Sequence, residues 1–224
     1  MKKNKQNAKV NESKTTNDII ELVFIIDKSG SMSGLESDTI GGFNSMISKQ
    51  KMEDGEAYVS TVFFNHESVV IHDRESLSTI EPLTARQYCV GGSTALLDAI
   101  GDAIHHIGNI HKYARREDVP AKTIFLITTD GMENSSRRYD SETVKNMIKR
   151  QEEKYGWEFV FVAANIDAVD TAGRIGIRSS RAANYRHDSR GTEMLYRAMS
   201  DAVTSYRKGT QVDDNWMDSL SASD

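Results

Sequence analysis

The chain has 224 residues, of which 38% are hydrophobic, and its formal net charge is −5 at pH 7. This composition fits one globular domain with room for terminal tails, and no apolar run approaches the ~18 residues that suggest a membrane span. The acidic balance argues against nucleic acid as a partner, and the single cysteine, Cys89, excludes an intrachain disulfide. The N-terminus carries lysines but lacks the apolar stretch of a secretory signal. We therefore expect a cytoplasmic protein that binds no membrane.

Both ends of the chain are expected to be tails. Residues 1–17 are polar and rich in lysine, without an apolar period, which predicts a disordered tail. Residues 209–224 are polar and acidic, and we expect a solvated tail there too. The alternative is that Trp216, Met217 and Leu220 form a short docking segment. The folded domain is thus expected over residues 18–208.

Between the tails, strands alternate with helices. Short buried runs predict strands, and apolar residues at three- and four-residue spacings predict helices. In chain order, the expected strands are 19–27, 56–65, 68–73, 121–129, 157–164 and 182–185, and the expected helices are 37–52, 94–112, 141–155, 167–175 and 192–208. This alternation predicts an α/β fold, a doubly wound and mostly parallel central sheet flanked by helices on both faces. In such folds, ligands bind outside the carboxyl ends of the strands.

A tight loop with three oxygen side chains follows the first expected strand. The stretch Glu21 to Met32 reads ELVFIIDKSGSM, so Asp27, Ser29 and Ser31 alternate with other residues just after an apolar run. Mg²⁺ prefers oxygen ligands in near-octahedral geometry and keeps several waters. The pattern therefore suits a magnesium site, and it suits equally a simple capped turn, which uses the same residue types.

Two later stretches add further oxygen side chains. The sequence VGGSTAL places Thr94 after two glycines at the start of a long helix. Helix capping explains one hydroxyl there but not the paired glycines. The sequence TTDG places Asp130 at the end of a buried strand, where a plain turn is the alternative. Asp27 and Asp130 both follow strand ends, so we expect them on the same rim of the sheet.

Together these stretches resemble the von Willebrand factor A domain family and its metal-ion-dependent adhesion site (MIDAS). The family pattern is D-x-S-x-S after the first strand, a threonine in a second loop and an aspartate in a third. This chain has all of its members, namely Asp27, Ser29, Ser31, Thr94 and Asp130. By element order the resemblance covers residues 19–207, a Rossmann-like fold. The length and the absent secretory signal resemble stand-alone bacterial or phage members, among them those associated with tellurium resistance and stress.

The resemblance implies a non-enzymatic module that holds Mg²⁺ or Mn²⁺ and recruits a protein partner. An acidic side chain of that partner would complete the coordination of the metal. The competing hypothesis is a metal-dependent phosphohydrolase in which Asp27 is the nucleophile. Against it, Ser29 stands where haloacid-dehalogenase enzymes have a second aspartate, and no nucleotide-binding glycine motif occurs.

Overall fold

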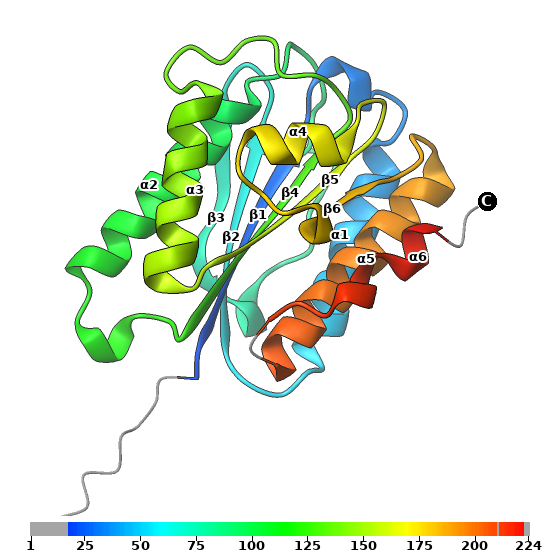
Figure 1. Ribbon diagram of the computed structural model, residues 1–224. Helices are drawn as coiled ribbons and strands as arrows, with labels where there is room; N and C mark the ends of the chain where they lie inside the picture. Colours follow the sequence, from blue (N-terminus) through cyan, green and yellow to red (C-terminus); the bar gives the residue numbers. More distant parts are fainter. Residues whose placement is uncertain (1–17, 210, 222–224) are drawn as a thin grey trace, which may run out of the picture.

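The computed structural model describes residues 18–209 and 211–221, and its centre is a six-stranded sheet. The strands lie in the order β3-β2-β1-β4-β5-β6 (Figure 1). Their bounds are Ile20–Asp27 (β1), Ala57–Phe64 (β2), Ser68–Ser76 (β3), Lys122–Thr129 (β4), Glu158–Ala163 (β5) and Ala182–Asn184 (β6). All neighbours pair in parallel except β2 and β3, which form an antiparallel edge. The predicted α/β class with a mostly parallel sheet is confirmed.

Helices cover both faces of this sheet. The helices are Glu36–Lys51 (α1), Leu96–Tyr113 (α2), Ser141–Tyr155 (α3), Ala168–Arg174 (α4), Ser189–Lys208 (α5) and Asp218–Ser221 (α6). In Figure 1, α2 and α3 lie on one side of the sheet, and α1, α5 and α6 lie on the other. Each side has its own hydrophobic core, so the architecture is doubly wound.

The central strand β1 explains why the sequence shows a continuous apolar run. Leu22, Phe24 and Ile26 point into the core beneath α1 and α5, while Val23 and Ile25 point into the core beneath α2 and α3. All five side chains are fully buried. Burying each side chain of this size stabilises the fold by roughly 1.5–3 kcal/mol, so β1 is a strongly fixed base for the loop that follows it.

Several element boundaries differ from those expected. Helix α2 begins at Leu96, so Thr94 lies in an extended loop before it. Helix α5 begins at Ser189, earlier than expected, because the Asp188 carboxylate accepts the N–H of Gly191 at 2.7 Å and caps the helix there. Strand β3 runs to Ser76 through register shifts opposite β2, with Arg74 at a φ of 53°.

The expectation of a solvated tail is wrong for residues 211–221. Val212 and Trp216 are each only 2% exposed and belong to the core on the α5 side. The Trp216 indole N–H donates to the carbonyl of Ser180 at 3.0 Å, and the buried Arg181 donates to the carbonyl of Val212 at 2.7 Å. These contacts with a distant loop hold the segment against the domain. The tail expected over residues 1–17 lies outside the described residues.

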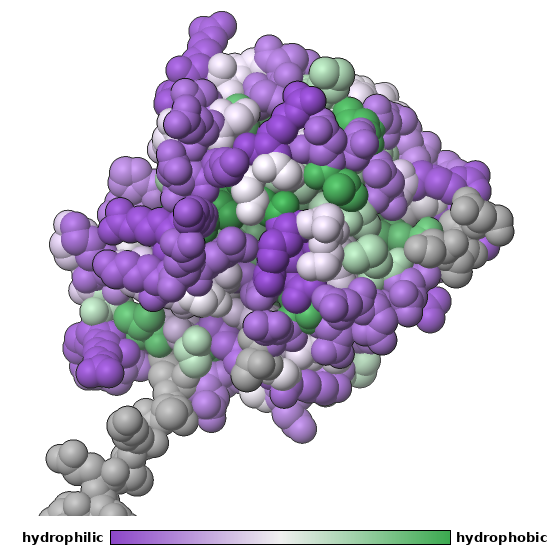
Figure 2. All heavy atoms as spheres, viewed as in Figure 1, coloured by the Kyte–Doolittle hydropathy of each residue, from purple (hydrophilic) through white to green (hydrophobic). Residues whose placement is uncertain are grey.

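The surface is mostly hydrophilic on the face drawn in Figure 2, with smaller hydrophobic areas between the charged groups. Among the described residues, no helix is long and apolar enough to cross a bilayer.

Candidate metal centre

Three loops meet at the carboxyl edge of the sheet beside β1 and β4. These two strands are neighbours, so Asp27, the last residue of β1, and Asp130, the residue after β4, come together although they are far apart in sequence. The loop before α2 is attached to the first loop by two backbone hydrogen bonds. The N–H of Gly30 donates to the carbonyl of Gly92 at 2.9 Å, and the N–H of Gly91 donates to that of Lys28 at 2.9 Å.

Asp27 is fully buried and held on both of its carboxylate oxygens. Its Oδ1 accepts the backbone N–H of Ser29 at 2.7 Å, and its Oδ2 accepts the hydroxyl of Thr129 at 2.6 Å. Burial raises the pKa of Asp27, the hydrogen bonds from Ser29 and Thr129 oppose that rise, and the charge of Asp130 adds to it. A carboxylate in this setting gains free energy from a cation nearby, because the positive charge compensates for lost hydration.

The serines and Asp130 form a connected chain of oxygens. Ser29 Oγ lies 3.1 Å from Ser31 Oγ, and the Ser31 hydroxyl donates to Asp130 Oδ1 at 2.5 Å. Ser29 and Asp130 are each 1% exposed, whereas Ser31 lies at the surface. The site therefore opens to solvent on the Ser31 side.

Thr94 reaches the same point from the second loop. A Cβ placed on Gly131 would lie 3.5 Å from Ser31 Oγ and 3.9 Å from Thr94 Oγ1, so both hydroxyls surround this glycine. Asn134 fixes the loop in place, because its Oδ1 accepts the Thr94 N–H at 2.9 Å and its own N–H donates to the Thr94 carbonyl at 3.0 Å. All five residues expected at the site are thus gathered at one rim.

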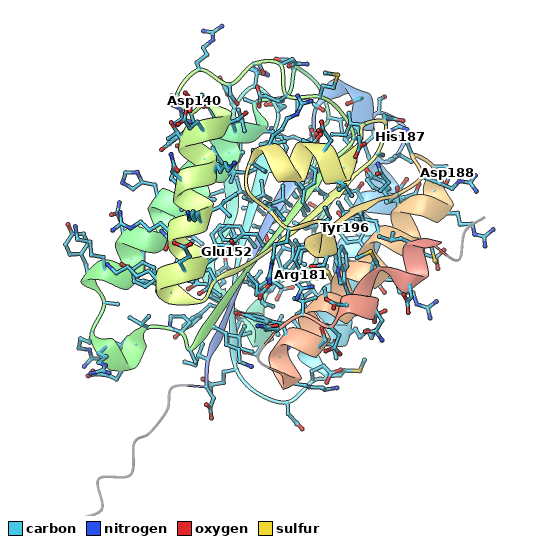
Figure 3. All side chains as sticks on the ribbon, viewed as in Figure 1. Asp140, Glu152, Arg181, His187, Asp188 and Tyr196 are labelled. Atoms are coloured by element: carbon cyan, nitrogen blue, oxygen red, sulfur yellow. The ribbon has the colours of Figure 1, made fainter. Side chains whose placement is uncertain are left out.

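The structure adds two side chains that the sequence did not single out. The Tyr88 hydroxyl donates to the backbone carbonyl of Asp27 at 2.5 Å, which fixes the end of β1. His187, labelled in Figure 3, comes from the loop between β6 and α5, and its Nε2 lies 2.9 Å from Asp130 Oδ2. Each is a lone residue outside any motif, and no local pattern marks it. Only the fold brings either one to the site.

The donor set fits a hard divalent cation. It offers two carboxylates and three hydroxyls, which are oxygen ligands of the kind Mg²⁺ and Mn²⁺ accept. The buried Asp130 Oδ2 has no hydrogen-bond partner among the described residues, so this acceptor is available to a cation. No group of three or more His, Cys, Asp or Glu in the described part of the chain could hold a metal on its own. A metal at this rim therefore depends on the serine and threonine hydroxyls.

A separate cleft of about 850 Å³ lies at the opposite end of the sheet, between α2 and α3, and is lined in part by Lys122 and Trp157. It contains none of the residues of the rim.

Comparisons with solved structures identify the fold. The chain is 14% identical to a von Willebrand factor type A protein from Catenulispora acidiphila, with a TM-score of 0.56 over 83% of this chain and 42% of that one. It is 15% identical to proximal thread matrix protein 1 from the mussel byssus, in a structure with a zinc-occupied MIDAS motif, with a TM-score of 0.54 over 84% and 46% of the chains. It is 12% identical to BatB from Bacteroides thetaiotaomicron, with a TM-score of 0.52 over 85% and 100%.

These similarities establish a von Willebrand factor A fold for this chain. The chain spans less than half the length of the first two of these proteins. No protein-family model matches the chain, and no curated protein matches it significantly. At such low identities the likeness concerns the fold alone, and function has to be argued from the rim itself.

Proposed function

We propose that this chain is a non-enzymatic von Willebrand factor A module that binds Mg²⁺ or Mn²⁺ and recruits a protein through an acidic side chain. The observation that carries the proposal is the gathering of Asp27, Ser29, Ser31, Thr94 and Asp130 at one rim. The zinc-occupied MIDAS in the mussel protein of the same fold supports a divalent metal.

The charges at the rim support recognition of a carboxylate. Of the five ligand side chains, only Asp27 and Asp130 carry a negative charge, and the other three are neutral hydroxyls. A divalent cation held by them would therefore remain electrophilic. An octahedral ion held from one side also keeps positions for water or an incoming oxygen. When bound, the metal would supply a Lewis-acidic centre for one anionic group of the partner. Asp27 and Asp130 would hold it directly or through water, and the hydroxyls of Ser29, Ser31 and Thr94 would complete its protein side.

Exposed apolar surface beside the rim supports a protein as the ligand. Met132 follows Asp130 by two residues and is 72% exposed. Methionine is enriched at protein interfaces relative to the rest of the surface, so Met132 beside the rim fits a protein as the ligand.

Metal binding is tested first, on the full chain. Thermal unfolding is followed in EDTA and at millimolar Mg²⁺ for wild type, Thr94→Ala and the control Thr171→Ala, which replaces a threonine of α4 outside the five rim residues. A ligand at a hundredfold excess over its Kd stabilises the native state by about 2.7 kcal/mol. We expect this gain for wild type and Thr171→Ala, and a smaller one for Thr94→Ala. The same melting temperature with and without metal in wild type would contradict the proposal.

Partner recruitment is tested by affinity capture from a cell extract with the same three proteins. A specific partner should be captured in Mg²⁺ by wild type and Thr171→Ala, and lost in EDTA or with Thr94→Ala. Calorimetry with that partner then compares its wild-type form with one whose acidic side chain is replaced by its amide. Equal affinities in Mg²⁺ and EDTA would place recognition on another face.

The alternative phosphohydrolase is disfavoured by the surroundings of Asp27. Both of its oxygens already accept hydrogen bonds, and the side chain is fully buried, so it is poorly placed to attack a substrate. Incubation with a generic phosphomonoester and Mg²⁺ tests this point. Turnover that Asp27→Asn abolishes would favour the enzyme.

A further inference from the structure

His187 and Asp130 approach each other without forming a hydrogen bond. His187 Nε2 lies 2.9 Å from Asp130 Oδ2, which meets the distance of an ion pair. Yet both atoms are buried and neither has a hydrogen-bond partner among the described residues. The distance between the two atoms is that of an ion pair, but their relative orientation does not form a hydrogen bond. The orientation carries more weight, because a hydrogen bond weakens steeply when its donor is misaligned.

The spacing has another physical reading. Two ligands at adjacent corners of an octahedral ion, each about 2.1 Å from the metal, lie about 3 Å apart and do not point at each other. The Nε2 of His187 and the Oδ2 of Asp130 have this separation. So do Ser29 Oγ and Ser31 Oγ, which are 3.1 Å apart. Two buried polar atoms that lie 2.9 Å apart, each without a hydrogen-bond partner among the described residues, are candidates to bind one cation between them.

The backbone on both sides holds His187 in this position. Before it, the N–H of Tyr185 donates to the carbonyl of Ala163 at 2.9 Å and so continues the pairing of β6 with β5. After it, Asp188 caps helix α5 through Gly191. Gly191 lies so close to the carbonyl of Arg186 that a Cβ there would be 1.9 Å from that oxygen. The imidazole is thus carried on a short segment fixed at both ends (Figure 3).

We propose that His187 is a nitrogen ligand of the metal bound beside Asp130, and that it gives this rim a preference for Zn²⁺ over Mg²⁺. This inference rests on the proposed function, since it concerns the same metal site. Imidazole suits zinc and the later transition metals, whereas Mg²⁺ is selected by oxygen ligands alone. Asp130, His187 and the hydroxyls would hold the ion directly, Asp27 would act on it through water, and the nitrogen ligand would favour Zn²⁺.

Pulsed electron paramagnetic resonance on the full chain loaded with Mn²⁺ tests the ligand directly, because a coordinated imidazole produces modulation from its ¹⁴N nucleus. We expect this modulation in wild type and in the control His105→Ala, whose histidine lies on α2 at the opposite end of the sheet. It should disappear in His187→Ala and in His187→Gln, which keeps a polar side chain of similar length. The wild-type spectrum tests the proposal even if a variant fails to fold.

Calorimetric titrations of Zn²⁺ and Mg²⁺ test the selectivity. Loss of the imidazole should weaken Zn²⁺ binding about tenfold or more while Mg²⁺ affinity changes much less. Mn²⁺ that binds without nitrogen modulation, or equal losses for both metals, would overturn the role of His187 and leave the proposed metal site standing. A wild-type chain that binds none of the three metals would overturn both.

Discussion

The Glu133 carboxylate accepts a hydrogen bond from the backbone N–H of Leu97, 3.0 Å away. Glu133 lies in the loop that follows Asp130, and Leu97 lies in the first turn of α2, just after Thr94. The other oxygen of Glu133 accepts the N–H of Ser135 at 2.9 Å. A negative side chain at this helix start satisfies a free N–H and matches the helix dipole. Glu133 therefore joins two of the loops that form the rim.

Replacing Glu133 with alanine should loosen that junction. We expect Glu133→Ala to lower the free energy of unfolding by about 1–3 kcal/mol, because buried donors lose their acceptor. Metal affinity should fall as well, since Thr94 and Asp130 lose their common support. Chemical denaturation and metal titration measure the two effects. The control Glu81→Ala removes an exposed carboxylate away from the rim and should change neither. Unchanged metal affinity in Glu133→Ala would show that the loops position themselves independently.

Asp98 organises the same loop from the helix side. Its carboxylate accepts the backbone N–H groups of Arg137 at 3.0 Å, Arg138 at 2.9 Å and Tyr139 at 3.0 Å. Burial raises the pKa of Asp98, but these three hydrogen bonds outweigh burial and hold the pKa below its ordinary value. A depressed pKa in the folded state contributes stability above the unfolded pKa, about 3.9, and this stability is lost as the pH falls through the folded pKa.

Asp98→Asn should therefore destabilise the fold in a pH-dependent way. At pH 7 we expect a loss of about 1–3 kcal/mol, because charge-assisted hydrogen bonds become neutral ones. The difference between variant and wild type should shrink as the pH falls below about 4, because the unfolded wild-type chain then takes up a proton at Asp98 that the folded chain does not yet bind. Urea denaturation across this range measures it, with Asp54→Asn as the control at an exposed position. A loss that does not vary with pH would assign the effect to packing.

Much of this arrangement can be predicted from sequence because it is carried by local patterns. The buried run before Asp27 and the turn after Thr129 are strand signals, and parallel strands bring their ends together. His187 and Tyr88 could not be predicted, because each reaches the site from a separate loop whose path depends on the whole sheet. From the sequence, docking of Trp216 is only the alternative to a solvated tail, because its neighbours along the chain are acidic and its acceptor, the carbonyl of Ser180, lies in a distant turn.

Gly92 is a position where a side chain would strain the second loop. Its φ is +79°, and a Cβ there would lie 2.3 Å from the ring nitrogen Nδ1 of His66. We expect Gly92→Ala to cost about 1–2 kcal/mol in backbone strain, to displace the loop that carries Thr94 and to weaken metal binding. The control Gly55→Ala has a similar φ of +92° with open space around it. The Gly55→Ala variant should lose stability but bind metal as tightly as wild type. Equal metal affinities in Gly55→Ala and Gly92→Ala would show that the loop carrying Thr94 does not support metal binding.

The buried indole of Trp216 should anchor the C-terminal segment. We expect Trp216→Ala to lower the free energy of unfolding by about 3 kcal/mol, because a large core side chain and its hydrogen bond are both lost. Thermal melts and proteolysis after residue 209 measure the effect, with the exposed neighbour Asn215→Ala as control. Wild-type behaviour of Trp216→Ala would mean that the segment adds nothing to the fold.

The strand order sets the stage of synthesis at which the metal centre can form. A nascent chain that has emerged only as far as α2 already carries Asp27, Ser29, Ser31 and Thr94, but β4, the strand beside β1, has yet to follow. Until it does, one edge of β1 is open, and open edges of this kind invite pairing with other chains. Under the proposed function, divalent ions would not stabilise this early intermediate, because Asp130 arrives with β4 and His187 later still. The ion would then act only on the nearly completed domain.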